Sequence, residues 1–123
     1  MEVYGIGTDI IEVERLHPGG KLPSQRFMQR CFTTNEAERL SKRPAEDMAG
    51  HFAAKEAVVK AMGTGFTGFW PCDVEVKHNS AGKPEVELHG RAAEIAKKAG
   101  IMGFEVSISH CRTLAVAMAV AFK

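Results

Sequence analysis

The strongest constraint on the fold of this chain is a single long helical segment, from Glu46 to Met62. It is dense in alanine, the residue with the strongest helix propensity. Pro44 stops any helix that precedes it, and Gly63 provides the glycine that commonly follows a helix C-terminus. No apolar run in the chain approaches the roughly 20 residues of a membrane span. The segment is therefore predicted to be one helix packed inside a globular domain, and no membrane is expected as a partner.

The remaining segments alternate between strand and helix patterns. Strands are predicted over residues 3–11, 74–76, 85–88, 104–109 and 114–122, and shorter helices over residues 24–31, from a cap at 33–35 to about 43, and 91–99. The turn sequence from Asn79 to Pro84 joins the second and third strands as a β-hairpin. With no repeat and no linker, residues 1–123 are predicted to form one small domain. Helices mixed with antiparallel strands in this order predict an α+β fold, with the strands packed against the long helix and the shorter helices.

Composition argues against several classes of protein. The chain has 123 residues, of which 45% are hydrophobic and 25% charged, as in ordinary globular domains. The formal net charge of +1 argues against a dedicated nucleic-acid binder, which would be strongly basic. Residues 1–5 include no basic leader ahead of an apolar stretch, so a secretory signal is not expected. Cys31, Cys72 and Cys111 are far apart and form no CxxC pair, which fits a reducing cytoplasm.

The first candidate site lies in the N-terminal strand. Alternate residues of a strand share a face, so Gly5, Gly7 and Asp9 lie on one side, which is nearly bare up to the carboxylate. A bare strand face lets another backbone or a ligand come close. The alternative is a structural role, in which Asp9 only caps a turn at the strand end.

Glu56 is the second candidate, because it does not lie on a solvated face of the long helix. At about 100° per residue it shares a small, apolar face with Ala49, Phe52, Ala53, Val59 and Lys60. A carboxylate there needs a partner, either a cation or Lys60 one turn later. The alternative is a partly buried Glu56–Lys60 pair on an ordinary amphipathic helix.

Together the two patterns predict a metal site. The bare strand face suits close packing against Ala49 and Ala53, a contact that would bring Asp9 and Glu56 near each other. Two carboxylates beside an open cavity suit a hard cation such as Mg²⁺, completed by water and phosphate oxygens.

Three other segments carry polar groups. Gly63-Thr64-Gly65 could let a ligand approach the backbone, although a simple helix C-cap is the commoner meaning of such a sequence, and no Walker loop is present. His110 ends a predicted strand, where it either binds phosphate or fills a turn. Cys111 is adjacent to it, and neighbouring strand residues point to opposite faces, so no thiol–imidazole pair is expected. Residues 15–30 include Arg15, Lys21, Arg26 and Arg30 but no acid, which is ordinarily the pattern of a solvated face.

The motifs GIGTDIIEV at residues 5–13 and FAAKEAVVKAMGTG at residues 52–65 resemble the holo-acyl-carrier-protein synthase family, the stand-alone branch of the phosphopantetheinyl transferases. The segments 82–84 and 107–110 also match, so the resemblance spans nearly the whole chain. It implies an enzyme that uses magnesium to transfer 4'-phosphopantetheine from coenzyme A to a serine of an apo acyl carrier protein, releasing adenosine 3',5'-bisphosphate. It also implies a homotrimer that holds coenzyme A between neighbouring protomers.

The resemblance assigns roles to individual residues. It makes Asp9 and Glu56 the magnesium ligands and Lys60 a phosphate contact, and it places Gly63, Thr64, Gly65 and His110 along the coenzyme A site. Glu56 and Lys60 are the catalytic candidates, while the general base stays open among Glu56, a metal-bound hydroxide and water. The helix with Arg26 and Arg30, and Arg15 before it, looks like the family's surface for docking the carrier protein. The last strand is apolar on both faces, which agrees with a trimer.

Two positions depart from the family pattern, and two other functions stay open. His51 stands where many relatives have Arg, and Cys111 where some carry an acid, so neither is given a role. A non-catalytic oligomeric module that binds a nucleotide or a carrier protein is the alternative function. A different coenzyme A enzyme, such as an acyltransferase, is a third. The native carrier, whether for fatty acids or polyketides, also stays open.

Overall fold

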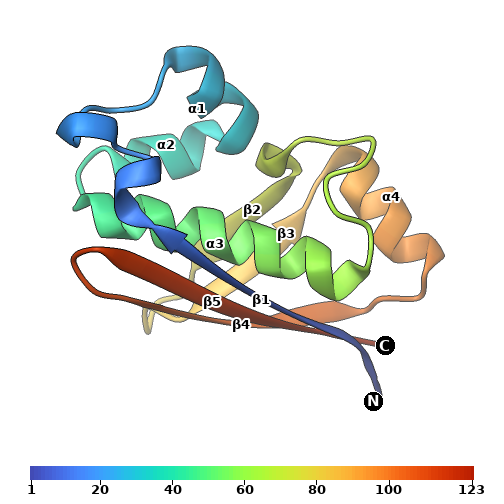
Figure 1. Cartoon of the computed structure of the whole chain (residues 1–123). Coiled ribbons are helices and arrows are strands. Elements are labelled where there is room, and N and C mark those ends of the chain that lie inside the picture. The colour runs from blue at the N-terminus through green and yellow to red at the C-terminus, as the bar shows by residue number, and fades with distance from the viewer.

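The chain folds around helix α3 (Ala45–Met62) in the computed structural model, which describes all 123 residues (Figure 1). Its first turn contains Glu46 and Asp47 and its last turn Lys60, an order of charges that suits the helix dipole. Gly63 ends the helix with φ of 79°, a left-handed conformation that favours glycine. The predicted long helix and its C-terminal glycine are both confirmed.

The other elements confirm the α+β class. They are β1 (Val3–Glu12), α1 (Gln25–Cys31), α2 (Thr34–Leu40), β2 (Val74–His78), β3 (Pro84–Leu88), α4 (Gly90–Lys98), β4 (Gly103–His110) and β5 (Leu114–Phe122), with 3₁₀ turns at Val13–Arg15, Pro18–Gly20 and Pro71–Asp73. α2 begins with the predicted threonine cap, Thr33, whose side chain and Glu36 form a reciprocal capping box. It ends earlier than predicted, because residues 41–43 form a turn ahead of Pro44.

A three-stranded antiparallel sheet, in the order β1-β5-β4, carries α3 on one face (Figure 1). In its register Asp9 of β1 lies opposite Ala117 of β5, which lies opposite Ile108 of β4. The helix side of β5 consists of alanines that are 0–1% exposed, namely Ala115, Ala117, Ala119 and Ala121. β2 and β3 form a separate antiparallel hairpin, as predicted. Small side chains along β5 therefore let α3 lie close to the sheet.

Two glycines of β1 determine how closely the strand approaches α3. A Cβ atom on Gly7 would overlap the carbonyl oxygen of Ala57, and one on Gly5 would overlap that of Ala61. The predicted close contact between the bare strand face and the long helix is thus confirmed. The predicted helix partners, Ala49 and Ala53, were wrong, because α3 crosses the sheet obliquely. Its N-terminal half packs at Gly50 on Ile108 of β4, whereas Gly5 and Gly7 of β1 meet Ala61 and Ala57 in its C-terminal half.

The opposite face of the sheet is apolar and open. Ile6 and Ile10 of β1 are 66% and 62% exposed, and Met118 and Val116 of β5 are 53% and 39% exposed. β5 is thus apolar on both faces, as predicted, with alanines against α3 and larger side chains outward. No helix is both long and apolar enough to span a bilayer.

Candidate functional site

Asp9, Glu56 and Lys60 meet where β1 passes the C-terminal half of α3. Lys60 Nζ lies 3.3 Å from Asp9 Oδ1 and donates to the carbonyl oxygen of Thr8 at 2.9 Å. Glu56, one helical turn before Lys60, is half-buried. Burial raises the pKa of Glu56, and the negative charge of Asp9 raises it further, whereas Lys60 and Arg15 oppose this shift. The structure therefore brings together the three residues that the sequence predicted to meet.

This group has the donor chemistry for a hard cation. It contains two carboxylates and one ammonium, and the Asp9 and Lys60 side chains are 18% and 52% exposed, so the group opens to solvent. The charge of Asp9 disfavours ionisation of Glu56, a conflict that a divalent cation between them would relieve. Mg²⁺ commonly binds one or two carboxylates and completes its shell with waters and substrate phosphates. Asp9 and Glu56 thus fit magnesium.

The Gly63-Thr64-Gly65 loop follows directly from this end of α3. The Gly63 N–H donates to the carbonyl oxygens of Val59 and Lys60, as expected for a helix C-cap. Gly65 also has a positive φ, of 60°, and no atom lies within 4 Å of where its Cβ would be. The loop is therefore a helix cap that also leaves open space for a ligand near Lys60.

His110 lies elsewhere in the chain. It ends β4, and its Nε2 atom lies 3.1 Å from Asp47 Oδ1 at the start of α3. Since β5 separates β1 from β4, a single chain does not bring His110 to the Asp9–Glu56 pair. His110 instead borders a cavity of about 250 Å³, lined by Arg39, Arg43, Asp47, His51, His78, Gly82, Pro84, Ile108 and His110.

Sequence reasoning missed two members of this cavity, His51 and His78. Their ring centroids are 5.0 Å apart, and both are mostly shielded from solvent. His51 Nδ1 lies 2.7 Å from the carbonyl oxygen of Asp47, one turn earlier in α3, while its Nε2 has no hydrogen-bond partner. Burial lowers the pKa of His51 to about 4 and also lowers that of His78. The helical spacing of His51 from Asp47 was visible in the sequence, but the approach of His78 was not.

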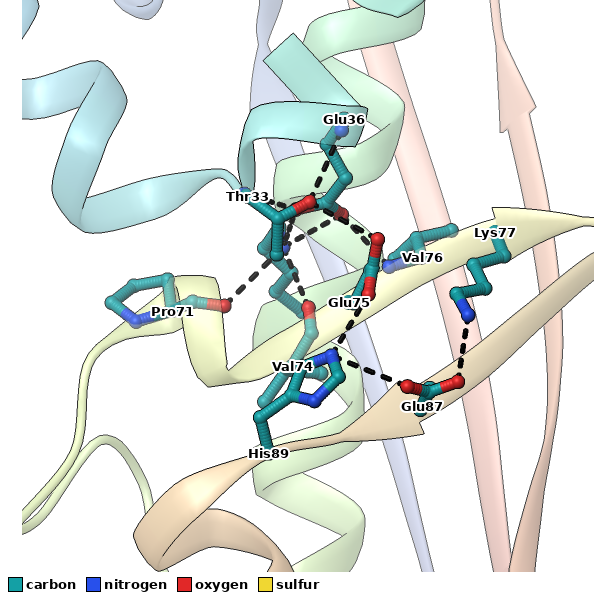
Figure 2. Close-up of polar contacts among 10 residues, drawn as sticks. Thr33, Glu36, Pro71, Val74, Glu75, Val76, Lys77, Glu87 and His89 are labelled. Carbon is teal, nitrogen blue, oxygen red and sulfur yellow. Dashed lines mark hydrogen bonds and ion pairs between the residues drawn. The ribbon is translucent and has the colours of Figure 1, made fainter.

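A second missed feature is the buried ion pair between Lys55 and Glu36 (Figure 2). Lys55 Nζ lies 2.8 Å from both Glu36 oxygens and also donates to the carbonyl oxygens of Pro71 and Val74. Burial lowers the pKa of Lys55, which the Glu36 charge opposes. Because Lys55 directly precedes Glu56, this network fixes the helix turn that presents the candidate metal ligand.

Figure 2 also shows a polar group on the β2–β3 hairpin, formed by Glu75, Glu87 and His89. Their ligand atoms lie within 4.8 Å of one another, which is close enough to hold a metal ion. Each carboxylate already has a protein partner, since His89 Nε2 is 2.8 Å from Glu75 and Lys77 Nζ is 2.7 Å from Glu87. This group shares no residue with the Asp9–Glu56 pair.

The predicted basic surface lies beside the carboxylates. Arg26 and Arg30 are both exposed on α1, and Arg15 is close enough to Glu56 to influence its pKa. The Arg30 guanidinium lies 4.6 Å from the ring centre of the exposed Trp70. A hollow of about 400 Å³ adjoins this surface, lined by Ser24, Arg26, Phe27, Arg30, Cys31, Phe52, Trp70 and Pro71.

Comparisons with known proteins cover almost the whole chain. The family model described as the 4'-phosphopantetheinyl transferase superfamily matches residues 5–118. A holo-[acyl-carrier-protein] synthase of Caldanaerobacter subterraneus is 46% identical over 98% of this chain and 95% of the relative. A protein of the same name from Alkaliphilus metalliredigens is also 46% identical, over 97% of this chain and 98% of the relative.

Solved structures show the same fold. The holo-[acyl-carrier-protein] synthase of Neisseria meningitidis matches with a TM-score of 0.89 and 33% identity, covering 99% of this chain and 100% of that one. A Helicobacter pylori synthase, solved in complex with coenzyme A, matches with a TM-score of 0.83 and 26% identity, covering 95% and 99%. A Plasmodium yoelii synthase with ADP bound matches with a TM-score of 0.85 and 31% identity, covering 98% and 95%.

Proposed function

Because the chain belongs to the 4'-phosphopantetheinyl transferase superfamily, we propose that it transfers 4'-phosphopantetheine from coenzyme A to a serine of an apo acyl carrier protein. The observation that carries this proposal is the meeting of Asp9, Glu56 and Lys60 at the edge of α3. Relatives with this fold bind coenzyme A or ADP, which agrees with a phosphate-binding site.

The chemistry follows from the three side chains. Asp9 and Glu56 would hold the magnesium ion, which neutralises charge on the pyrophosphate oxygens when it is bound. Lys60 adds a positive charge beside them and stabilises negative charge that develops on the transferred and leaving groups. The serine oxygen forms a bond to the phosphorus next to pantetheine, the bond to the bridging oxygen breaks, and adenosine 3',5'-bisphosphate leaves. Glu56, or a water beside it, would accept the serine proton.

The proposed enzyme is a homotrimer with its sites between protomers. The open apolar face formed by Ile6, Ile10, Val116 and Met118 favours burial against another copy of the chain. The cavity at His110 lies across β5 from Asp9, so a ligand that touches both groups would have to lie between two copies. One protomer would then supply Asp9, Glu56, Lys60 and the Gly63–Gly65 loop, and its neighbour would supply the His110 cavity for the phosphate-bearing nucleotide end.

The proposed protein partner docks on the surface of Arg15, Arg26 and Arg30. These side chains are exposed, and Arg15 is close enough to Glu56, where the serine of the carrier has to arrive, to influence its pKa. Complementary charge at such a rim mainly steers encounter and orientation. Cytoplasmic action agrees with the three free cysteines.

One experiment tests the activity directly. The protein is mixed with coenzyme A, magnesium and an apo acyl carrier protein, and the carrier is weighed by intact-mass spectrometry. A mass gain equal to one phosphopantetheine group is expected. A carrier that binds but gains no mass would favour a non-catalytic binding module, and a carrier modified by an acyl group would favour an acyltransferase.

A further inference from the structure

We propose that the cavity beside His110 takes up a proton together with the phosphate monoester of coenzyme A, and that this proton is accepted by buried His51 and its half-buried neighbour His78. The inference rests on the proposed function, since it assumes that a coenzyme A phosphate enters this cavity. It assigns His51 and His78 as residues that make phosphate recognition depend on pH.

The first argument is an unsatisfied nitrogen. His51 is 5% exposed, and a carbonyl oxygen can only accept, so the Nδ1 atom that lies 2.7 Å from the Asp47 carbonyl carries a hydrogen. The neutral ring then presents Nε2 as a bare acceptor, and this atom has no partner. A buried polar atom without a partner is costly, and native proteins rarely retain one without a reason. A proton on Nε2 that donates to an anionic oxygen would satisfy it.

The second argument is the balance of charge around the cavity. Arg39 comes from α2, Arg43 from the turn before α3, His78 from β2 and His110 from β4. The only lining acid is Asp47, whose two oxygens lie 2.8 Å from Arg43 and 3.1 Å from His110. Lys55 also faces His51, but its charge is paired with Glu36. The cavity therefore has spare positive charge and lacks an anion.

The third argument is that His51 and His78 can share one proton but hold two only with difficulty. Their rings are 5.0 Å apart, and His78 Nδ1 is also without a partner. Burial, which lowers the pKa of His51 to about 4, and the nearby cations keep the pair neutral at pH 7 in the free protein. A phosphate dianion favours the charged imidazolium, so the pKa is higher in the complex than in the free protein.

The sign of the pH effect follows from this difference. The affinity falls as pH rises from the pKa of the free His51–His78 pair to the higher pKa of the complex, and it levels off above that value. Linkage of one proton limits this loss to about tenfold per pH unit. Dephospho-coenzyme A, which lacks the phosphate monoester, should show no such loss.

Calorimetry with adenosine 3',5'-bisphosphate tests the proposal at pH 7.5 and above, where the phosphate itself, with a second pKa near 6, is already a dianion. Titrations in buffers of different ionisation enthalpy should show uptake of up to about one proton per ligand by the wild-type protein. The variant His51→Gln keeps a polar side chain that cannot titrate, and it should lose this uptake and flatten the pH dependence of Kd. The control His17→Gln changes a histidine outside the cavity and should behave like the wild type.

Imidazole ¹⁵N spectra of the wild-type protein keep the test decisive if a variant fails to fold. At pH 7, adenosine 3',5'-bisphosphate should convert one ring of the His51–His78 pair to imidazolium. The proposal is overturned if neither ring changes, if His51→Gln and His78→Gln both keep wild-type uptake, or if dephospho-coenzyme A shows the same pH slope. These measurements need no carrier protein, so their failure is distinct from a failure of phosphopantetheine transfer.

Discussion

Helix α3 carries a polar group on each side, and the two groups have opposite needs. Toward β1, Asp9 and Glu56 place two carboxylates beside one lysine, open to solvent. Toward β4, buried His51 stands among arginines and histidines with a single acid, Asp47. The first group has more negative than positive charge, and the second has more positive than negative charge. The proposed ligand, a magnesium–pyrophosphate unit joined to a phosphorylated nucleoside, would satisfy both.

The largest effect is expected when one of the two carboxylates is removed. Asp9→Ala and Glu56→Ala should each lower transfer by on the order of a hundredfold or more, because one remaining carboxylate holds magnesium poorly. Both variants should need more magnesium and should keep the wild-type circular dichroism spectrum. Glu94→Gln, on the exposed surface of α4, serves as the control. Full activity of Asp9→Ala together with loss in Glu87→Gln would move the metal to the hairpin group.

The second prediction compares how tightly α3 packs at its two ends. Gly7→Ala forces a Cβ into the backbone of Ala57, which cannot move aside, so we expect a loss of about 3 kcal/mol in the free energy of unfolding. Gly50→Ala meets only side chains, Ile108 at 2.8 Å and His110 at 3.8 Å, and alanine is about 1 kcal/mol better than glycine inside a helix. Its net effect should be near zero. Urea unfolding measures both, and equal losses would contradict the oblique packing of α3.

The third prediction tests whether Asp9 of one protomer and His110 of a neighbouring protomer act in the same active site. Asp9→Ala and His110→Ala proteins should each be weakly active alone. After mixing and subunit exchange, about a quarter of the sites in randomly assembled trimers should combine an intact Asp9 with an intact His110. Transfer should rise to about that fraction of the wild-type rate. No recovery, despite exchange confirmed by native mass spectrometry, would show that both residues act within one chain.

The smallest effect concerns carrier docking. Arg26→Glu and Arg30→Glu should each raise KM for the carrier several-fold, with little change in KM for coenzyme A, because rim charges act on encounter. Salt should weaken wild-type docking, since exposed charges are screened over about 8–10 Å near physiological ionic strength. Lys97→Glu, on α4, is the matched charge reversal away from this surface. An unchanged carrier KM and salt slope would move docking to another face, for example that of Arg39, Lys42 and Arg43.

The elements could be predicted from the sequence because their causes are local. Period, caps and glycines identified every helix and strand, and the bare face of Gly5 and Gly7 predicted the approach to a small-residue face of the helix. The part of the helix that contacts β1 could not be predicted, because Ala49, Ala53, Ala57 and Ala61 repeat every four residues and offer the same small face. Only the crossing of α3 over the sheet selects the last two.

The missed residues depend on contacts between distant segments. Lys55 lies inside the recognised motif, but its partner Glu36 belongs to α2, and its carbonyl acceptors are Pro71 and the first residue of β2, Val74. His51 likewise meets His78 only because the β2–β3 hairpin packs beside α3. The spacing of residues within one segment does not predict which residues of a distant segment they will contact. The presence of Lys55 beside Glu56 was visible in the sequence, but its burial and its role were not.

The Lys55–Glu36 pair has a consequence for how α3 can move. Toward the sheet, the neighbours of α3 are glycine and alanine, so on that side few bulky side chains prevent the helix from turning about its own axis. Lys55 restrains this rotation, because four oxygens surround its ammonium group. Turning the helix by one residue would leave this charge buried without a partner. Breaking such a pair costs about 3–5 kcal/mol, more than thermal motion readily supplies. The angular setting of Glu56, the proposed metal ligand, is thus held by a neighbouring residue whose own side chain is fully buried.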